Sequence, residues 1–259
     1  MIRLKSAAEI EAIGEAGAIV GEALALVERM IEPGVSTLEL DEAAEELVRS
    51  FNGAEPAFKG LYGFPATLCT SLNEEVVHGI PSASRVLEDG DIVSADVGVK
   101  LNGFYADAAV TVPVGRVSGG VDRLLEVTRK ALDAGIKQAF AGNRLGDLGA
   151  SIQTIVEKAG YSVIRELVGH GVGEAAHEEP QVPNFGRPGR GTRIEPGLVI
   201  AIEPMVNMGG RAIRTLRDGW TVVTADGSLS AHYEHTVAIT ETGPRIVTHA
   251  PLPTAAGEE

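Results

Sequence analysis

The sequence predicts an α+β protein built from two halves of similar design. Two pairs of amphipathic helices are each followed by a group of short strands, so one element order occurs twice. No stretch repeats at a fixed period, so the expected duplication is one of architecture. Two units that face each other form a cleft, a common place for an active site. We expect one domain over residues 1–250 and a frayed tail over residues 251–259.

The first helix pair is expected near the N-terminus. Apolar side chains recur at helical spacing over residues 5–30, and Pro33 with Gly34 ends that run. Gly17 falls on the apolar face, where a missing side chain permits close packing. A second helix follows Ser36.

The second helix pair is expected over residues 119–141 and 145–159. Two or three short strands are expected over residues 66–112, and glycine-punctuated strands over residues 161–247. This order completes the two halves.

Composition excludes several classes of function. The 259 residues include 22 Lys+Arg and 36 Asp+Glu, a formal net charge of −14, which argues against binding to nucleic acids or anionic membranes. No window approaches the ~18 apolar residues of a membrane span, and Glu9, Glu11 and Glu15 stand where a signal peptide is apolar. The single cysteine, Cys69, cannot form an internal disulfide. We therefore expect a cytoplasmic protein.

Two aspartates lie on a predicted β-hairpin. Asn102-Gly103 between alternating apolar runs is a strong hairpin signal. In that register Gly98 faces Asp107, and Asp96 lies on the same face, roughly 7–8 Å away along the diagonal. Two such carboxylates repel unless a positive group lies between them, and Gly98 leaves room for one. Solvated strand and turn residues are the alternative, but the apolar flanks favour burial and hence a metal or acid–base role.

Two histidines lie in a glycine-rich segment. On one continuous strand His170 and His177 would face opposite sides, but Gly171 and Gly173 let the backbone turn so that both converge. Gln181 stands where a zincin motif needs its second histidine, and no G-x-G-x-x-G opens a helix. A tight turn with two incidental histidines is the alternative.

Two glutamates occupy apolar strand runs. Glu203, held extended by the proline after it, is expected to point into the core or the cleft. If residues 230–237 form one strand, His232, Glu234 and Thr236 share a face. Taken alone, each run fits a structural ion pair equally well.

Together these segments indicate a metal site. Four carboxylates and one or two imidazoles carry too much negative charge for a dry cluster, and two divalent cations would neutralise it. Two-metal sites, with ions ~3.5–4 Å apart, use bridging carboxylates and activate a shared water. An oxygen-rich ligand set favours Mn, Fe or Co.

The segments that carry this chemistry resemble the type I methionine aminopeptidases of the pita-bread fold. They are Asp96 to Asp107, Gly169-His170-Gly171 with His177-Glu178-Glu179-Pro180, Ile202-Glu203-Pro204, and Tyr233-Glu234-His235-Thr236. The resemblance covers nearly the whole chain, including residues 72–81 and 218–221. It is closest to the short bacterial-type form, because no Cys/His-rich N-terminal extension and no helical insert between His170 and Glu203 is seen.

The resemblance implies removal of the initiator methionine from peptides and nascent chains with a small second residue. It implies that Asp96 binds one metal through both oxygens. Asp107 and Glu234 would bridge two metals, while His170 and Glu203 would complete the other site. A metal-bridging hydroxide would attack the first peptide bond. Co, Mn, Fe(II) and Zn are the candidate metals.

The resemblance also implies residues that bind the substrate. His177 would hydrogen-bond the scissile amide and stabilise the oxyanion, and His78 would contact the amide nitrogen or assist the leaving amine. By position, the methionine pocket comprises Phe58, Leu61, Phe64, Cys69, Ala176 and Trp220. For each of these alone, an ordinary core role is the alternative. Backbone carbonyls matching a monovalent-cation site belong to Asn73, Glu75 and Ser230.

Some positions depart from the family pattern. Leu61 and Phe64 replace frequent tyrosines, Ala176 replaces an aromatic residue, and His232 replaces a frequent glutamine. These changes alter the expected pocket shape but keep it apolar. On the face of Glu234, His232 is a candidate hydrogen-bond donor that tunes the bridging carboxylate. We expect a monomer, with the ribosome as a candidate partner.

Three other functions share part of this residue pattern. A proline-specific peptidase of the same fold shares all five ligands but usually carries a further N-terminal domain. A pseudo-peptidase that only binds nascent chains would be expected to lack ligands, and none is missing. A two-metal phosphoesterase would need an arginine clamp, which these segments lack.

Overall fold

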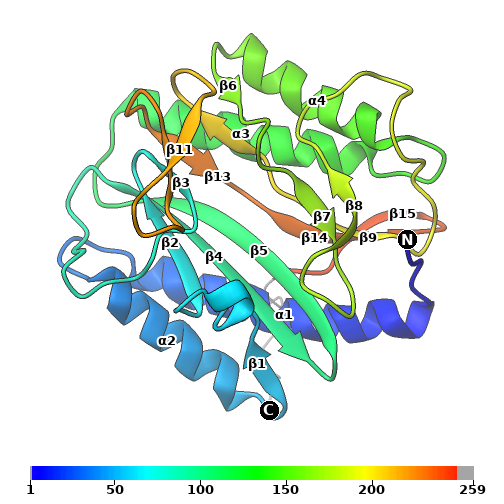
Figure 1. The fold of residues 1–259 in the computed structure, drawn as a ribbon, viewed down its shortest axis with the longest axis horizontal. Coiled ribbons are helices and arrows are strands. Elements are labelled where there is room, and N and C mark those ends of the chain that lie inside the picture. Colours follow the sequence, from blue (N-terminus) through cyan, green and yellow to red (C-terminus); the bar gives the residue numbers. More distant parts are fainter. Residues whose placement is uncertain (1, 250–259) are drawn as a thin grey trace, which may run out of the picture.

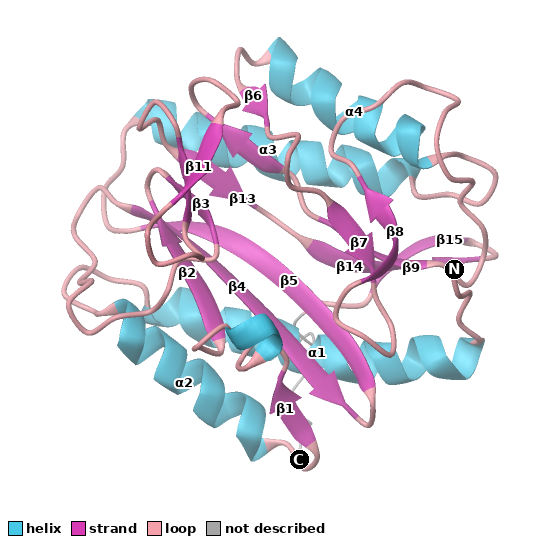
Figure 2. Ribbon diagram, viewed as in Figure 1, coloured by secondary structure: helices cyan, strands magenta, loops and turns pink. Residues whose placement is uncertain are grey.

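The computed structural model describes residues 2–249, so the predicted tail at residues 251–259 lies outside the described part of the chain. Two helix pairs form the outer layers, and the strands lie between them (Figures 1 and 2). The helices are α1 (Ala7–Met30), α2 (Thr37–Ser50), α3 (Gly119–Gln138) and α4 (Leu145–Lys158). All four predicted helices are confirmed, with ends within a few residues of those expected.

Individual residues explain where the first helix pair begins and how closely it packs. The Ser36 hydroxyl accepts the N–H of Glu39 at 3.3 Å and so caps α2. A Cβ atom at Gly17 would overlap the carbonyl oxygen of Val247, so the missing side chain does permit the predicted close packing. Each pair covers its own apolar core, α1 and α2 against one group of strands and α3 and α4 against the other.

The first half contains the predicted hairpin. Its sheet consists of β1 (Ala54–Pro56), β2 (Leu68–Leu72), β4 (Ile92–Leu101) and β5 (Phe104–Pro113). β4 pairs with the other three strands. Gly98 faces Asp107, and the turn residues Asn102 and Gly103 have φ of 51° and 88°. The predicted register is therefore confirmed, since Asn-Gly accepts this left-handed turn at little cost.

Gly98 serves a different purpose from the one expected. A Cβ atom there would lie 2.7 Å from the Phe58 ring and 3.0 Å from Cβ of Ala57. The space that the missing side chain of Gly98 leaves is filled by the Phe58 ring, so it is not the place where a positive group between Asp96 and Asp107 would lie. Glycine is needed here because an aromatic ring packs directly on the backbone.

The second half carries most of the remaining strands. The five-stranded sheet has the order β15-β14-β9-β7-β8. Its strands are β7 (Gly169–Gly171), β8 (Glu178–Val182), β9 (Val199–Ile202), β14 (His235–Thr240) and β15 (Gly243–Ile246). A three-stranded sheet joins β13 (Ser230–His232), β10 (Met205–Asn207) and β6 (Ser162–Val163). Another joins β11 (Ile213–Thr215), β12 (Val222–Thr224) and β3 (Glu75–Val77). Because the short β3 pairs with the distant β12, the segment expected to hold two or three strands holds four: β2, β3, β4 and β5.

The single strand expected over residues 230–237 is interrupted. β13 and β14 are separated at Tyr233 and Glu234, because the chain there turns to contact β5. The N–H of Glu234 donates to the carbonyl of Ala109 at 2.9 Å. The Tyr233 hydroxyl donates to the carbonyl of Thr111 at 2.7 Å. Hydrogen bonds to β5 in the other half therefore replace regular strand pairing at these two residues.

A second break lies beside the first. β9 ends before Glu203, and β10 begins after Pro204. β9 pairs with β14 and β10 pairs with β13, so the two interruptions are adjacent. Glu203 and Glu234 therefore both lie outside the paired strands, next to each other in the fold.

None of the helices within residues 2–249 combines the length and apolar character that crossing a bilayer requires.

Candidate metal centre

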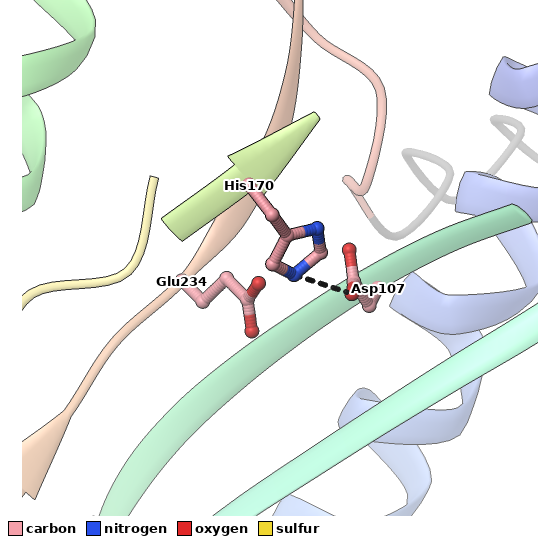
Figure 3. A group of neighbouring side chains, drawn as sticks. All are labelled: Asp107, His170 and Glu234. Atoms are coloured by element: carbon pink, nitrogen blue, oxygen red, sulfur yellow. Dashed lines mark ion pairs between the residues drawn. The ribbon is translucent and has the colours of Figure 1, made fainter. Parts of the chain in front are cut away.

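The five predicted ligand residues come together on the wall of one cavity of about 260 Å³. They are Asp96 on β4, Asp107 on β5, His170 on β7, Glu203 after β9 and Glu234 before β14. Figure 3 shows three of them with their polar ends directed toward one another. One potential ligand atom from each of Asp107, His170 and Glu234 lies within 4.8 Å of the others. The cluster therefore draws on both halves of the fold.

The His170 ring is oriented for binding a cation. Its Nδ1 atom lies 3.0 Å from the carbonyl oxygen of Gly171, which can only accept, so Nδ1 carries the hydrogen. The other nitrogen, Nε2, lies 3.4 Å from Oδ2 of Asp107 (dashed in Figure 3) and 3.5 Å from Oε1 of Glu203. A neutral imidazole with this orientation presents a lone pair to the carboxylates.

The carboxylates around His170 are buried and repel one another. Burial, and then the negative charge of Asp107, raise the pKa of Asp96 and of Glu203 well above the usual range. The same two causes raise the pKa of Glu234. Within residues 2–249, Oδ1 of Asp96 is buried without a hydrogen-bond partner. An uncompensated group of this kind fits divalent cations, which prefer oxygen ligands and supply the missing positive charge.

Hydrogen bonds from neighbouring polar side chains orient Asp107 and Glu203. The buried Thr236 hydroxyl lies 2.9 Å from Oδ1 of Asp107 and accepts the N–H of Asp107 at 3.1 Å. The side-chain amide of Asn184 donates to the backbone carbonyl of Glu203 at 2.9 Å. Sequence reasoning missed Asn184, because it lies in a loop after β8 with no periodic pattern around it.

His177 and His78 lie at the edges of the cluster. The His177 and His170 rings have centroids 4.4 Å apart, so the two histidines do converge. Burial lowers the pKa of His78, and burial together with the neighbouring His170 ring lowers the pKa of His177. Both rings are therefore neutral at pH 7. His78 also has a φ of 60°, a conformation that non-glycine residues adopt only when their surroundings impose it.

The rest of the cavity wall is largely apolar. Of the six predicted pocket residues, five line it: Phe58, Leu61, Phe64, Cys69 and Trp220. Ala176 is buried but is not among the lining residues, which corrects the predicted pocket. Lining residues that sequence reasoning missed are Tyr62, Val77, Leu167, Val168 and Met205. No local pattern marks these five, because the route of the surrounding loops decides which side chains face the cavity.

His232 also lines the cavity. Its buried Nε2 atom lies 3.9 Å from Oε2 of Glu203 and 3.9 Å from Oε2 of Glu234, with no hydrogen bond to the described residues. The strand break does not remove it from the neighbourhood of Glu234.

Of the three residues predicted to bind a monovalent cation, Asn73 and Ser230 are in contact. The carbonyl of Asn73 accepts the N–H of Ser230 at 2.9 Å. Glu75 accepts the N–H of Leu72 through its side chain at 2.8 Å.

Comparison with known proteins agrees with this geometry. Residues 11–241 match the model of metallopeptidase family M24. A methionine aminopeptidase of Clostridium perfringens is 55% identical over 96% of this chain and 99% of its own length. The crystal structure of the Thermotoga maritima methionine aminopeptidase has a TM-score of 0.94 at 46% identity, covering 96% of this chain and all of that one.

The proline-specific relatives are more distant. The prolidase of Pyrococcus horikoshii has a TM-score of 0.77 at 25% identity, and the match covers 96% of this chain but 64% of the prolidase. Both likenesses confirm the predicted pita-bread fold, and the higher identity and coverage decide between the two groups. The chain therefore belongs to metallopeptidase family M24 and, within it, to the methionine aminopeptidases.

Proposed function

We propose that this protein removes the N-terminal methionine from peptides and nascent chains whose second residue is small, by metal-dependent hydrolysis of the first peptide bond. One observation carries the proposal: a cluster of buried carboxylates and an oriented imidazole forms one end of a cavity whose other end is apolar. A free amine and a carbonyl suit the first end, and a thioether side chain suits the second.

We assign the binding of two divalent cations to the acidic end. The proposed ligands are Asp96, Asp107, His170, Glu203 and Glu234, with Asp107 and Glu234 shared between the ions. When bound, such cations polarise a peptide carbonyl and lower the pKa of water. Mn, Fe(II) and Co suit an oxygen-rich set best, and Zn completes the panel to be tested.

The neutral histidines have proposed roles in handling the scissile peptide. Each offers one N–H and one lone pair at pH 7, because its pKa is lowered. We assign His177 as a donor to the oxygen that becomes negatively charged in the transition state. We assign His78 to the amide nitrogen, where it holds or delivers the proton that the leaving amine needs.

The rim of the cavity supports a preference for a small second residue. The ring of Tyr62 lies over the ring of His177, with centroids 6.0 Å apart and planes 23° apart. We assign these two cavity-lining side chains to limiting the size of the second residue of a bound peptide.

We further propose a monovalent cation at the carbonyls of Asn73, Glu75 and Ser230. Its support is that the carbonyl of Asn73 lies beside the backbone of Ser230, whose N–H it accepts at 2.9 Å. A single domain over residues 1–250, a monomeric state and cytoplasmic action on chains leaving the ribosome stay predictions.

The test is methionine release from Met-Ala-Ser and from matched tripeptides with a bulky second residue. The protein is first treated with a chelator, and Mn, Fe(II), Co or Zn is then added back. Release that depends on metal and fails with a bulky second residue supports the proposal. Folded, metal-loaded protein that releases no methionine would overturn it and favour a binding role.

A further inference from the structure

The loop that carries His177 has little support of its own. It runs over residues 172–177 between β7 and β8, and Glu174, Ala175 and His177 itself are exposed. Within residues 2–249, no hydrogen bond to the His177 ring is seen. The position of this ring therefore depends on its packing against Tyr62 and His170 and on how the loop backbone is held.

The carboxylate of Glu178, the residue after His177, binds back to the backbone of the loop. Oε1 of Glu178 accepts the N–H groups of Glu174 at 2.7 Å and Ala175 at 3.2 Å. Its other oxygen, Oε2, lies 2.5 Å from Nζ of Lys5. The Lys5 side chain is only 1% exposed, and its ammonium also donates to the carbonyl of Arg3 at 3.1 Å. The buried ammonium of Lys5, 173 positions away in the chain, thus holds the Glu178 carboxylate that binds the loop backbone.

The pair fits tightly against the loop backbone. A Cβ atom at Gly173 would overlap Cε of Lys5 and lie 2.7 Å from Oε1 of Glu178. The carbonyl of Gly173 accepts the N–H of Tyr105, near the tip of the β4–β5 hairpin, at 2.8 Å. The N–H of Lys5 in turn donates to the carbonyl of Gly197 at 2.6 Å. The loop is therefore held between the hairpin and the N-terminal segment.

Charge keeps this arrangement together at neutral pH. Burial raises the pKa of Glu178, but the hydrogen bond and charge of Lys5, together with the N–H groups of Ala175 and Glu174, outweigh burial and leave the pKa below its usual value. Removing one partner of a buried pair is costly, because the other charge is left uncompensated.

We propose that Lys5 and Glu178 are positioning residues for His177. They do not touch the substrate; they hold the loop so that the His177 ring remains beside His170 at the cavity. This inference rests on the proposed function for its kinetic consequence and adds the N-terminal segment to the catalytic apparatus.

The kinetic test compares Lys5→Met in the natural sequence and in a His177→Ala background. In the natural sequence, kcat for Met-Ala-Ser is expected to fall about 10- to 100-fold, the scale of a misplaced catalytic group, with little change in KM. In the His177→Ala background no further fall is expected. Equal falls in both backgrounds would overturn the inference, because a general loss of structure acts regardless of His177.

The matched control is Arg245→Met. Arg245 pairs with Glu11 and so also ties the N-terminal helix to the second half, and within residues 2–249 it has no hydrogen bond or ion pair with residues 172–177. Its kcat is expected to stay unchanged. A fall equal to that of Lys5→Met would assign the effect to anchoring of α1.

A second readout needs no catalysis. In Lys5→Met, the ¹⁵N imidazole resonances of His177 are expected to shift, and the amides of Glu174 and Ala175 to exchange faster with solvent. Unchanged resonances and exchange would overturn the inference even if the protein released no methionine. If Lys5→Met does not fold, Glu178→Gln replaces it in both tests, because it removes the charge but keeps an acceptor oxygen.

Discussion

The hydroxyl of Thr236 lies 2.9 Å from the Oδ1 atom of Asp107, although the two residues are 129 positions apart. Thr236 is on the five-stranded sheet of the second half, and Asp107 is on the hairpin of the first. The same hydroxyl accepts the backbone N–H of Asp107 at 3.1 Å. One side chain therefore sets both the backbone and the carboxylate of a proposed bridging ligand, across the junction of the halves.

This contact predicts the effect of Thr236→Val. The substitution keeps the shape of the buried side chain but removes the support of Asp107. Metal affinity, measured by titration calorimetry after chelation, is expected to fall about 10- to 100-fold, as for other residues that orient ligands. Thr154→Val, on the exposed face of α4, is the control. Unchanged affinity in Thr236→Val would contradict the assignment of Asp107.

Loss of a proposed bridging carboxylate is expected to abolish activity without lowering stability. In Asp107→Asn and Glu234→Gln, methionine release is expected to disappear. The Tm of the metal-free protein is not expected to fall, because each change relieves repulsion among buried acids. Turnover and thermal unfolding check the two parts. Natural turnover in both variants would refute the two-metal assignment.

Removal of His177 should act on the transition state. In His177→Ala, kcat is expected to fall about 100- to 1000-fold, the range for a lost oxyanion donor, while KM changes little. Steady-state kinetics on Met-Ala-Ser checks this. A change in KM alone would indicate that His177 only binds the substrate.

The aromatic contact at Gly98 makes a prediction about the pocket. In Gly98→Ala the Phe58 ring must move away from β4, which narrows the apolar end of the cavity. KM for methionyl peptides is expected to rise, with a loss of about 1–3 kcal/mol in unfolding free energy from overpacking. Gly120→Ala in α3, where an added Cβ would make only an ordinary contact of 3.7 Å with Oγ of Ser118, is the control. Equal effects of the two changes would contradict this account.

Acid should weaken the contact between α2 and the loop that holds Phe58. The hydrogen bond from Lys59 at 2.6 Å, assisted by Arg49, lowers the pKa of Glu45 from 4.5 to about 2. A lowered pKa stabilises the fold at pH above 4.5, and this contribution is lost as pH falls from 4.5 toward 2.

Glu45→Gln tests the direction of this pH dependence of stability. Its Tm is expected to lie below that of the natural sequence at pH 6, and the two values are expected to converge near pH 2. Calorimetric melts at several pH values measure the difference, with the exposed Glu46→Gln as control. A Tm difference that stays constant with pH would rule out the ion pair as its source.

Much of the site could be predicted because local chemistry controls it. The Asn102-Gly103 turn and the two-residue period of strands set the register that brings Asp96 close to Asp107. Glycines beside His170 let the chain bend so that His177 returns to the same place.

The sequence by itself therefore determined the helices, the hairpin and the identity of the acids and histidines that meet in the cavity. Only the tertiary structure decided the strand breaks beside Glu203 and Glu234, the Phe58 ring over Gly98 and the hold of Lys5 on Glu178. Turn geometry and periodicity act over a few residues and are visible in the sequence. These other features arise where distant segments compete for the same backbone groups and the same space, and that competition is settled only when both halves of the chain have come together.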